Sequence, residues 1–216
     1  MQQGKRAITP DEMRQIERRC YAMGIPPSAL MEAAGTRVAE FVRSEMKADS
    51  TILFVCGTGN NGGDGFVAAR ELAGDYSVVV ALIGGKDSIK HGAARDNFDA
   101  LLKSGVRVIE KAGRDTVSEL SAKADAVVCA IFGTGFHGTP PKEASDAIEA
   151  INKSRKSIVI AVDVPSGMDA KTGEDSHSVV ADYTVTFHAV KTGLLASRKA
   201  GKVVVADIGI PEEAEI

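Results

Sequence analysis

Residues 51–65, TILFVCGTGNNGGDG, decide how the rest of the chain is interpreted. The first six are apolar or β-branched, which is typical of a strand buried on both faces, and the next nine contain five glycines. Glycine permits positive φ angles and close backbone approach, and exposed N–H groups at the start of a helix favour an anion such as phosphate. The stretch therefore predicts a strand, a ligand-binding turn and a helix.

The glycines alone do not identify the ligand. Gly57, Gly59 and Gly62 satisfy the G-x-G-x-x-G spacing of dinucleotide-binding turns. That fingerprint requires neither an Asn-Asn pair nor an acid after its glycines, and the charge of Asp64 would repel a phosphate. A tight strand-to-helix connection without a ligand is the remaining interpretation.

On either side of this stretch, runs rich in Val and Ile alternate with amphipathic segments. Because several of the runs are apolar nearly throughout, they predict an α/β fold, a Rossmann-like doubly wound, mostly parallel sheet sandwiched by helices. No helix is predicted between residues 163 and 183. We expect strands at 51–56, 77–83, 106–109, 126–132, 157–162, 183–189 and 202–206, and helices at 65–73, 93–103, 116–122 and 142–153.

Two extra N-terminal helices precede the first strand. Thr9, Pro10 and Glu12 form a capping box with proline at the first helical position, and Gly24 is placed to end that helix. The second helix is predicted over residues 28–46, where apolar residues recur at spacings of three and four.

Composition limits the function classes. The 216 residues suit a single domain over residues 1–216, and 26 basic against 29 acidic side chains leave no basic cluster for nucleic acid. No apolar run approaches the roughly 20 residues that span a bilayer. The three cysteines lack metal or redox spacing, and with no signal peptide they indicate a reducing, cytoplasmic location.

A second glycine turn follows the fourth predicted strand. In a doubly wound sheet the first and fourth strands commonly lie side by side at the point where strand order reverses, so the two turns should face each other across one cleft. His137 could titrate there, although a solvent-exposed or structural histidine is the commoner case. The candidate residues are Gly133, Thr134, Gly135, Phe136, His137, Gly138 and Thr139.

Two charged residues end later strands at the same edge. Asp163 follows the fifth strand, where it is placed for proton transfer or for hydrogen bonding in the Pro165–Gly167 turn. Lys191 follows the sixth, where it would bind phosphate, hold Asp163 ionised or remain solvated. Ser166 lacks the partners of a catalytic nucleophile.

The chain resembles the NAD(P)H-hydrate epimerase family, whose domain is also called the YjeF N-terminal domain. The resemblance covers essentially the whole chain, and its most specific parts are NNGGDG at residues 60–65 and DVPSGMD at 163–169, which occur together and in order. It implies an isomerase of nicotinamide cofactor repair, which interconverts the R and S forms of hydrated NADH and NADPH and uses no redox cofactor.

The resemblance also implies which residues act. The substrate site would comprise Asn60, Asn61, Gly62, Gly63, Asp64, the 133–139 turn and Asp163. From their positions at strand ends, Asp163 and Lys191 are the candidate catalytic residues. Asn61 and Ser166 would give oxygen ligands to a potassium ion. Where the family has an aspartate as a third ligand, this chain has Cys129, which predicts a weaker or altered cation site.

Partners and rival functions complete the predictions. Because the chain stops soon after Pro211, a dehydratase acting on the product is expected to be a separate protein, and a homodimer is expected. One alternative is a noncatalytic binding or dimerisation module of the same family, which Cys129 favours and Asp163 disfavours. Another is an ordinary nicotinamide-dependent dehydrogenase, for which Asp87 is the candidate ribose-binding acid.

Overall fold

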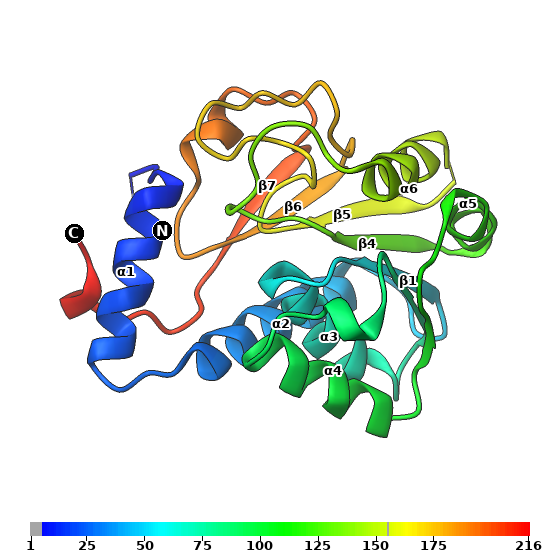
Figure 1. Cartoon of the computed structure of the whole chain (residues 1–216), viewed down its shortest axis with the longest axis horizontal. Coiled ribbons are helices and arrows are strands. Elements are labelled where there is room, and N and C mark those ends of the chain that lie inside the picture. The colour runs from blue at the N-terminus through cyan, green and yellow to red at the C-terminus, as the bar shows by residue number, and fades with distance from the viewer. Residues whose placement is uncertain (1–5, 155) are drawn as a thin grey trace.

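The computed structural model describes residues 6–154 and 156–216. Over these residues it contains six α-helices, seven strands and three short 3₁₀ turns, in the order predicted (Figure 1). The elements are α1 Pro10–Ala22, α2 Pro27–Glu45, β1 Thr51–Cys56, α3 Asn60–Leu72, β2 Ser77–Leu82, η1 Lys86–Ser88, α4 Ala93–Lys103, β3 Arg107–Ile109, α5 Arg114–Lys123, β4 Ala126–Ala130, α6 Lys142–Lys153, β5 Ile158–Val162, β6 Tyr183–Phe187, η2 Thr192–Leu195, β7 Lys202–Ala206 and η3 Glu212–Ala214.

The seven strands form one sheet in the order β3-β2-β1-β4-β5-β6-β7, and every neighbouring pair is parallel. The chain grows outward from β1 to β3, crosses back to β4 beside β1, and then grows the other way. The connections after β1 and β4 therefore diverge to opposite faces, which opens a crevice at the carboxyl edge between them. The predicted fold class is confirmed.

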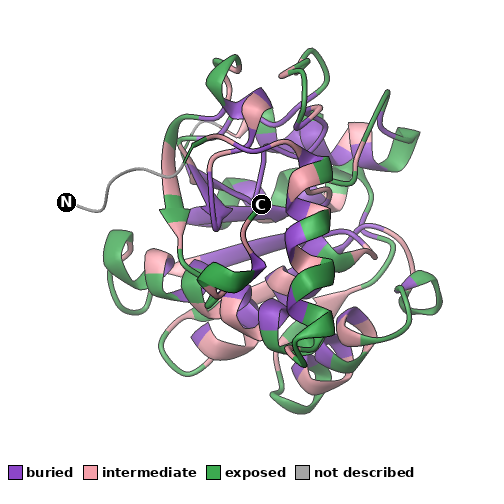
Figure 2. Ribbon diagram, turned by 90° about the vertical axis from the view of Figure 1, so that its left-hand side faces the viewer, coloured by how far each residue is buried: buried purple, intermediate pink, exposed green. Residues whose placement is uncertain are grey.

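Helices cover both faces of the sheet. Phe54 and Cys56 belong to the core that β1 shares with α1 to α4, whereas Leu53 and Val55 belong to the core beneath α5 and α6. Because both faces are covered, the central strands are apolar along their length, and Figure 2 shows them buried between helices with exposed outer sides.

The N-terminal helices form as the sequence predicts. Thr9 Oγ1 accepts a hydrogen bond from the N–H of Glu12 at 3.2 Å, and the N–H of Thr9 donates to Glu12 Oε2 at 2.7 Å. Helix α2 packs tightly on α3, since a Cβ added at Gly35 would lie 2.3 Å from the Cβ of Val67. Figure 1 shows α1 at one end of the molecule, beside the C-terminal segment.

Three predicted boundaries are wrong. Helix α3 begins at Asn60, not at residue 65, and strands β4 and β6 each end two residues earlier than predicted. Glycine normally weakens a helix, but here its missing side chain lets the first turn of α3 press against the end of β1, so tertiary packing overrides local propensity. The predicted lack of a helix between β5 and β6 is confirmed, and Val164, Met168 and Ala170 there form part of a small separate core.

Two further properties of the described residues bear on membrane spans and cysteines. None of the helices in residues 6–154 and 156–216 combines the length and apolar character needed to cross a bilayer. Cys20, Cys56 and Cys129 are all buried free thiols.

Candidate active site

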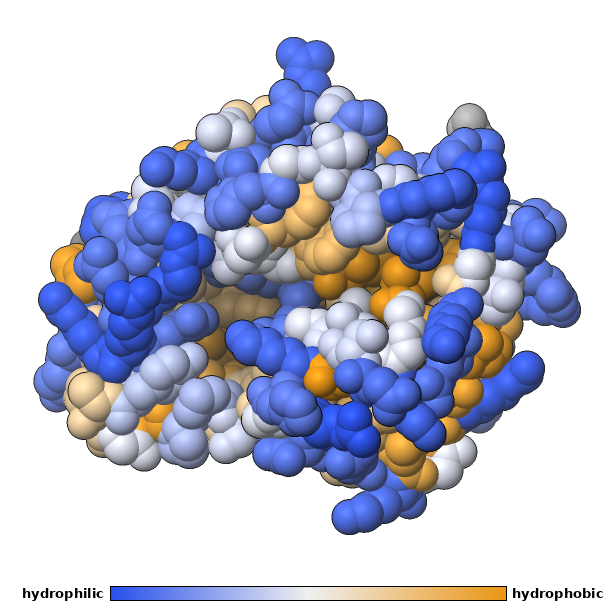
Figure 3. Space-filling model, in the orientation of Figure 1, coloured by the Kyte–Doolittle hydropathy of each residue, from blue (hydrophilic) through white to orange (hydrophobic). Residues whose placement is uncertain are grey.

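A cavity of about 940 Å³ opens at the carboxyl edge of the sheet, where β1, β4 and β5 end. Helix α1, the first turn of α3, residues 90–93 and the second glycine turn form its walls. On the face shown in Figure 3 a hollow with an apolar interior and a hydrophilic rim lies at the centre of the molecule. The cavity lies at the reversal of strand order, where open α/β sheets bind ligands.

The first turn of α3 is packed against the strand that precedes it. A Cβ added at Gly62 would lie 2.0 Å from the carbonyl oxygen of Gly57, and one at Gly65 would lie 2.8 Å from Sγ of Cys56. Neither position has room for a side chain. The N-terminus of α3 is thereby held at the edge of the cavity, where its unpaired backbone N–H groups favour an anionic ligand group.

The second glycine turn is held by side chains from the segment after β5. The backbone N–H groups of Ile131 and Phe132 donate to Ser166 Oγ at 3.2 and 3.0 Å, and that of Thr134 donates to Asp163 Oδ2 at 3.3 Å. The rings of Phe132 and Phe136 stack with centroids 4.6 Å apart, and both rings line the cavity. The turn thus presents a flat aromatic surface beside the carboxylate of Asp163.

Asp163 and Lys191 form a buried ion pair. Nζ of Lys191 lies 2.7 Å from Oδ1 of Asp163, and it donates to Thr186 Oγ1 at 3.0 Å and to the carbonyl oxygen of Phe187 at 2.7 Å. These three acceptors use all three ammonium protons, and the lysine side chain is 0% exposed. Of the three positions that the sequence left open for Lys191, the structure shows the one beside Asp163, and Lys191 is not solvated.

The backbone at the ends of β5 and β6 is strained. Asp163 has φ 65° and His188 has φ 67°, in the left-handed region that non-glycine residues rarely adopt. Such conformations cost free energy and cluster at functional sites. In this conformation the Asp163 carboxylate contacts two neighbouring segments. Its Oδ1 accepts a hydrogen bond from Thr186 Oγ1 of β6 at 3.3 Å, and its Oδ2 accepts one from the second glycine turn.

Two further carboxyl groups line the cavity. Asp64 comes from the first half of α3, and Glu17 comes from α1. Burial raises the pKa of Asp64 well above its ordinary value, and the charges of Asp163 and Glu17 raise it further. Burial also raises the pKa of Glu17, with the charge of Asp163 as the next contribution. Glu17 was not predicted from the sequence. Its only signal there is its position four residues after Met13, which places both side chains on the same side of helix α1.

The rim of the cavity is basic. Arg14 and Arg18 of α1, together with Lys90 and His91 before α4, are among its lining residues. Arg14 pairs with Asp11 at 2.5 Å, whereas the side chains of Arg18 and Lys90 form no ion pair with the described residues. An acidic interior beneath a basic rim suits a ligand with a phosphate group at one end and a cationic or proton-transferring centre at the other.

The structure brings most of the predicted site residues to this cavity. Asp87, the candidate for a dehydrogenase, lies in the exposed η1 turn and does not line it. Gly62 and Gly63 are buried in packing contacts, and His137, Gly138 and Thr139 lie outside the lining. The predicted residues that line the cavity are Asn60, Asn61, Asp64, Gly133, Thr134, Gly135, Phe136, Asp163 and Lys191.

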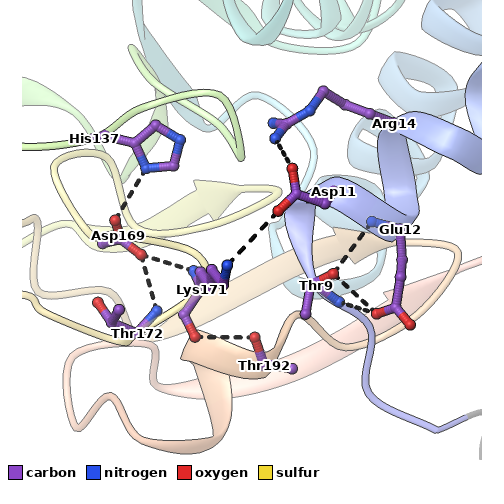
Figure 4. A network of polar contacts seen from close by, with 9 residues as sticks. All are labelled: Thr9, Asp11, Glu12, Arg14, His137, Asp169, Lys171, Thr172 and Thr192. Carbon is purple, nitrogen blue, oxygen red and sulfur yellow. Dashed lines mark hydrogen bonds and ion pairs between the residues drawn. The ribbon is translucent and has the colours of Figure 1, made fainter.

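His137 belongs to a polar network beside the site (Figure 4). Its Nδ1 lies 3.0 Å from Oδ2 of Asp169, and that hydrogen bond is the main reason why the pKa of Asp169 falls to about 2. Asp169 Oδ1 accepts from the N–H groups of Lys171 and Thr172 at 2.9 Å each. Lys171 Nζ reaches Asp11 of α1 at 3.7 Å. The network links the second glycine turn to the start of α1.

Of the potassium ligands implied by the resemblance, Asn61 is available, whereas Ser166 and the residue at position 129 do not fit that ion. Asn61 is 8% exposed, and neither Oδ1 nor Nδ2 has a hydrogen-bond partner among the described residues, so it suits a ligand. Ser166 Oγ is occupied, since it accepts from two N–H groups and donates to the carbonyl of Phe132 at 3.1 Å. Burial raises the pKa of the Cys129 thiol to about 11, and a neutral thiol is a poor ligand for a hard cation. Among the described residues, no group of three or more His, Cys, Asp or Glu is placed to hold a metal.

Known proteins resemble this chain over nearly its full length. A bifunctional NAD(P)H-hydrate repair enzyme, Nnr, of Hyperthermus butylicus is 41% identical over 214 residues, which are 98% of this chain and 40% of that protein. The chain thus spans about two fifths of the length of this relative. An NAD(P)H-hydrate epimerase of Cenarchaeum symbiosum is 37% identical, and the match covers 96% of this chain and 97% of that protein.

The fold and the family agree with these relatives. The crystal structure of yeast ynu0 superimposes with a TM-score of 0.79 at 23% identity, covering 97% of this chain and 92% of that one, which supports the fold. Residues 27–193 match the family model described as YjeF-related protein N-terminus. Since that match covers most of the chain and includes both glycine turns, Asp163 and Lys191, the chain belongs to the YjeF-related N-terminal family.

Proposed function

We propose that this chain is an isomerase that interconverts the R and S forms of hydrated NADH and NADPH. Relatives that match it over 95% or more of its length are named NAD(P)H-hydrate epimerase or repair enzyme. The cavity of about 940 Å³ is near the upper end of the roughly 300–1,000 Å³ typical of ligand pockets. That size favours a dinucleotide over a small metabolite.

The observation that carries the proposal is the Asp163–Lys191 ion pair at the junction of the two glycine turns. The Asp163 side chain is 11% exposed and that of Lys191 is 0% exposed, so the pair lies largely away from water. An ionised carboxylate in such a place stabilises a positive charge that develops next to it far better than water does.

Epimerisation of the hydrated ring needs such a group. The hydroxyl at carbon 6 takes up a proton and leaves as water while the ring nitrogen lone pair forms a carbon–nitrogen double bond. Water then adds to either face of the cation and gives up a proton. The Asp163 carboxylate stabilises that cation. Lys191 is the counter-ion of Asp163 and holds its carboxylate in place through their 2.7 Å contact. No electron transfer is involved.

The rest of the cavity would orient the dinucleotide. The N-terminus of α3 and the rim residues Arg18 and Lys90 would bind the diphosphate. The stacked rings of Phe132 and Phe136 give a flat surface for a base or for the damaged ring. Binding energy from these remote groups holds the reacting carbon against Asp163.

Replacing Asp163 tests the proposal. In Asp163→Asn we expect the rate of R to S exchange, followed by chromatography of the hydrate, to fall by roughly 10²–10⁴-fold. Asp115→Asn is the matched control, because Asp115 is an exposed acid on α5 at the other face of the sheet. A wild-type rate in Asp163→Asn refutes the role.

A second variant separates catalysis from folding. Asp163→Asn leaves Lys191 buried without its counter-ion, which costs roughly 3–5 kcal/mol. The double variant Asp163→Asn/Lys191→Met removes both charges and should regain most of that stability while remaining inactive. Recovery of activity together with stability would show that the pair is only structural.

The rival functions have less support. A noncatalytic binding module needs neither a buried ion pair nor two further acids in its cavity, and three carboxyl groups disfavour the phosphates of RNA. A dehydrogenase would place an acid at the ribose, and Asp87 lies outside the cavity. The separate dehydratase, the homodimer, the cytoplasmic location and any preference between NADH and NADPH hydrates stay predictions.

A further inference from the structure

Helix α1 faces the cavity with one stripe of side chains. Met13, Glu17 and Tyr21 are four residues apart, which places them on one side of the helix, and all three line the cavity. Met13 is buried, Glu17 is half-buried and Tyr21 is 39% exposed, so the stripe runs from the core to the rim. Glu17 is therefore in the middle of the wall that α1 contributes.

The surroundings of Glu17 disfavour its charged form. Loss of water raises its pKa first, the Asp163 carboxylate raises it next, and Lys191, Arg14 and Lys90 oppose these effects. Lys191 already pairs with Asp163 at 2.7 Å. No described residue forms a hydrogen bond or ion pair with the Glu17 side chain, which leaves its carboxyl group to a molecule in the cavity.

Asp64 is the corresponding group on α3. Its carboxyl group likewise has no hydrogen bond or ion pair with any described residue, and it lines the same cavity. Desolvation, Asp163 and Glu17 all raise its pKa, and Lys191 alone opposes them. The cavity thus holds one ion pair, Asp163 with Lys191, and two further carboxyl groups from different helices.

An unsatisfied amide in the same cavity points to a ligand. Asn61 is 8% exposed, and both polar atoms of its side chain lack a hydrogen-bond partner among the described residues. A Cβ added at Gly133 would lie 3.1 Å from Asn61 Oδ1 and 3.2 Å from Asp163 Oδ2, so this amide faces the reacting end of the cavity. Burying an amide without partners costs free energy, which a ligand that donates and accepts hydrogen bonds would recover.

The chemistry of epimerisation needs proton carriers on both faces of the ring. The hydroxyl leaves one face as water and returns to the other, so a proton is delivered on the first face and taken up on the second. One acid serves both faces only if it moves around the ring. The three carboxyl groups are not gathered at one metal-binding point, since no such cluster occurs among the described residues. They are instead distributed over α1, α3 and the end of β5.

We propose that Glu17 and Asp64 are the two proton carriers of the epimerase, one for each face of the hydrated nicotinamide ring. This assignment rests on the proposed function. On one face the acid gives its proton to the hydroxyl oxygen, the carbon–oxygen bond breaks with its electron pair leaving on oxygen, water departs, and the nitrogen lone pair forms the double bond. On the other face water adds to carbon 6, and the second carboxyl group, ionised in that cycle, takes its proton. Asp163 stabilises the cation between these events.

Exchange with ¹⁸O-labelled water tests this assignment. Wild-type protein should interconvert the epimers and label both. Glu17→Gln and Asp64→Asn should each slow interconversion by about 100-fold, yet each should still label one epimer with retention, and the epimer labelled should differ between the two variants. Glu119→Gln, an exposed acid on α5, is the control and should match wild type.

The other outcomes are distinct. If one variant loses both labelling and interconversion while the other keeps both, a single acid serves both faces and the assignment is overturned. If both variants keep wild-type rates, it is also overturned. If wild-type protein neither labels nor interconverts the hydrates above the rate without protein, the proposed function fails first. Both substitutions replace a carboxyl group by an amide of nearly the same shape, so thermal unfolding should stay near wild type, and Glu17→Met serves as a second variant if the amide does not fold.

Discussion

The two glycine-rich turns have similar compositions but use glycine for different physical reasons. In the first turn, Cβ atoms added at Gly57 and Gly62 would lie 2.2 and 2.0 Å from backbone oxygens, so glycine is there because nothing larger fits. In the second turn, a Cβ at Gly135 or Gly138 meets no atom within 4 Å. The first turn is therefore a packed joint between strand and helix, and the second is an open rim.

This difference separates the tasks of the site. The packed joint fixes the N-terminus of α3, along with Asn61 and Asp64, against the sheet. The open rim carries the stacked rings of Phe132 and Phe136, and its backbone N–H groups donate hydrogen bonds to the side chains of Ser166 and Asp163. A rigid element positions the chemistry, while a surface turn adapts to the bulk of the ligand.

The largest expected effect is in the packed joint. Gly62→Ala would place a methyl group 2.0 Å from the carbonyl oxygen of Gly57, and we expect a loss of about 3 kcal/mol or more in the free energy of unfolding. Urea denaturation measures it. Gly59→Ala is the control in the same turn, since a Cβ there has no atom within 4 Å. Equal stability of the two variants would break the comparison.

Gly133 is where the second turn comes closest to the first. Its added methyl would lie between Asn61 and Asp163, 3.1 and 3.2 Å from their oxygens, so Gly133→Ala should disturb the reacting groups more than the fold. We expect turnover of the hydrate to fall roughly 10–100-fold. Urea denaturation should show a loss below about 1 kcal/mol. A loss as large as that of Gly62→Ala would place Gly133 with the packed joint.

The link between the second turn and Asp169 is pH-dependent. His137 lowers the pKa of Asp169 to about 2, so the folded state binds this proton less readily than the unfolded chain does. The stabilisation is therefore present above the ordinary pKa of about 4 and is lost as pH falls through about 2. Because the site is partly solvated, we expect Asp169→Asn to cost about 1 kcal/mol at pH 6 and progressively less as pH falls toward about 2.

Unfolding of wild type and Asp169→Asn by urea across that pH range makes the measurement. His137→Gln, which keeps a polar side chain at the exposed position, isolates the contribution of the imidazole. A stability difference that does not change with pH would contradict the prediction, because both the contact with His137 and the hydrogen bonds from Lys171 and Thr172 lower the pKa of Asp169.

The smallest effect is expected at the tip of the open rim. Gly135→Ala adds a methyl group that meets no atom within 4 Å, and Gly135 is not among the glycines with positive φ. We expect the free energy of unfolding to change by less than about 0.5 kcal/mol. A loss above about 1 kcal/mol would mean that the rim is as tightly packed as the joint.

Much of the fold followed from local pattern. All seven strands and the helices at 93–103 and 142–153 lie where hydrophobic periodicity predicts them, because strand and helix periods depend on residues close in sequence. The start of α3 was not predicted from local pattern. Glycines disfavour a helix, and this turn is helical because it packs against β1 and the second turn. Asp163 and the two turns were found because strand ends share one edge of a parallel sheet.

The sequence by itself determined the alternation of strands and helices, the strand-end acid and the presence of two glycine turns. Only the tertiary structure decided that Lys191 pairs with Asp163 and that Glu17 of the first helix lines the same cavity. It also decided that the hydroxyl of Ser166 is used in hydrogen bonds to the second glycine turn. The reason is that pairing, desolvation and pKa shifts depend on distances through space, and Glu17 and Asp163 are far apart in the chain. Local pattern fixes elements, whereas packing fixes which charges meet.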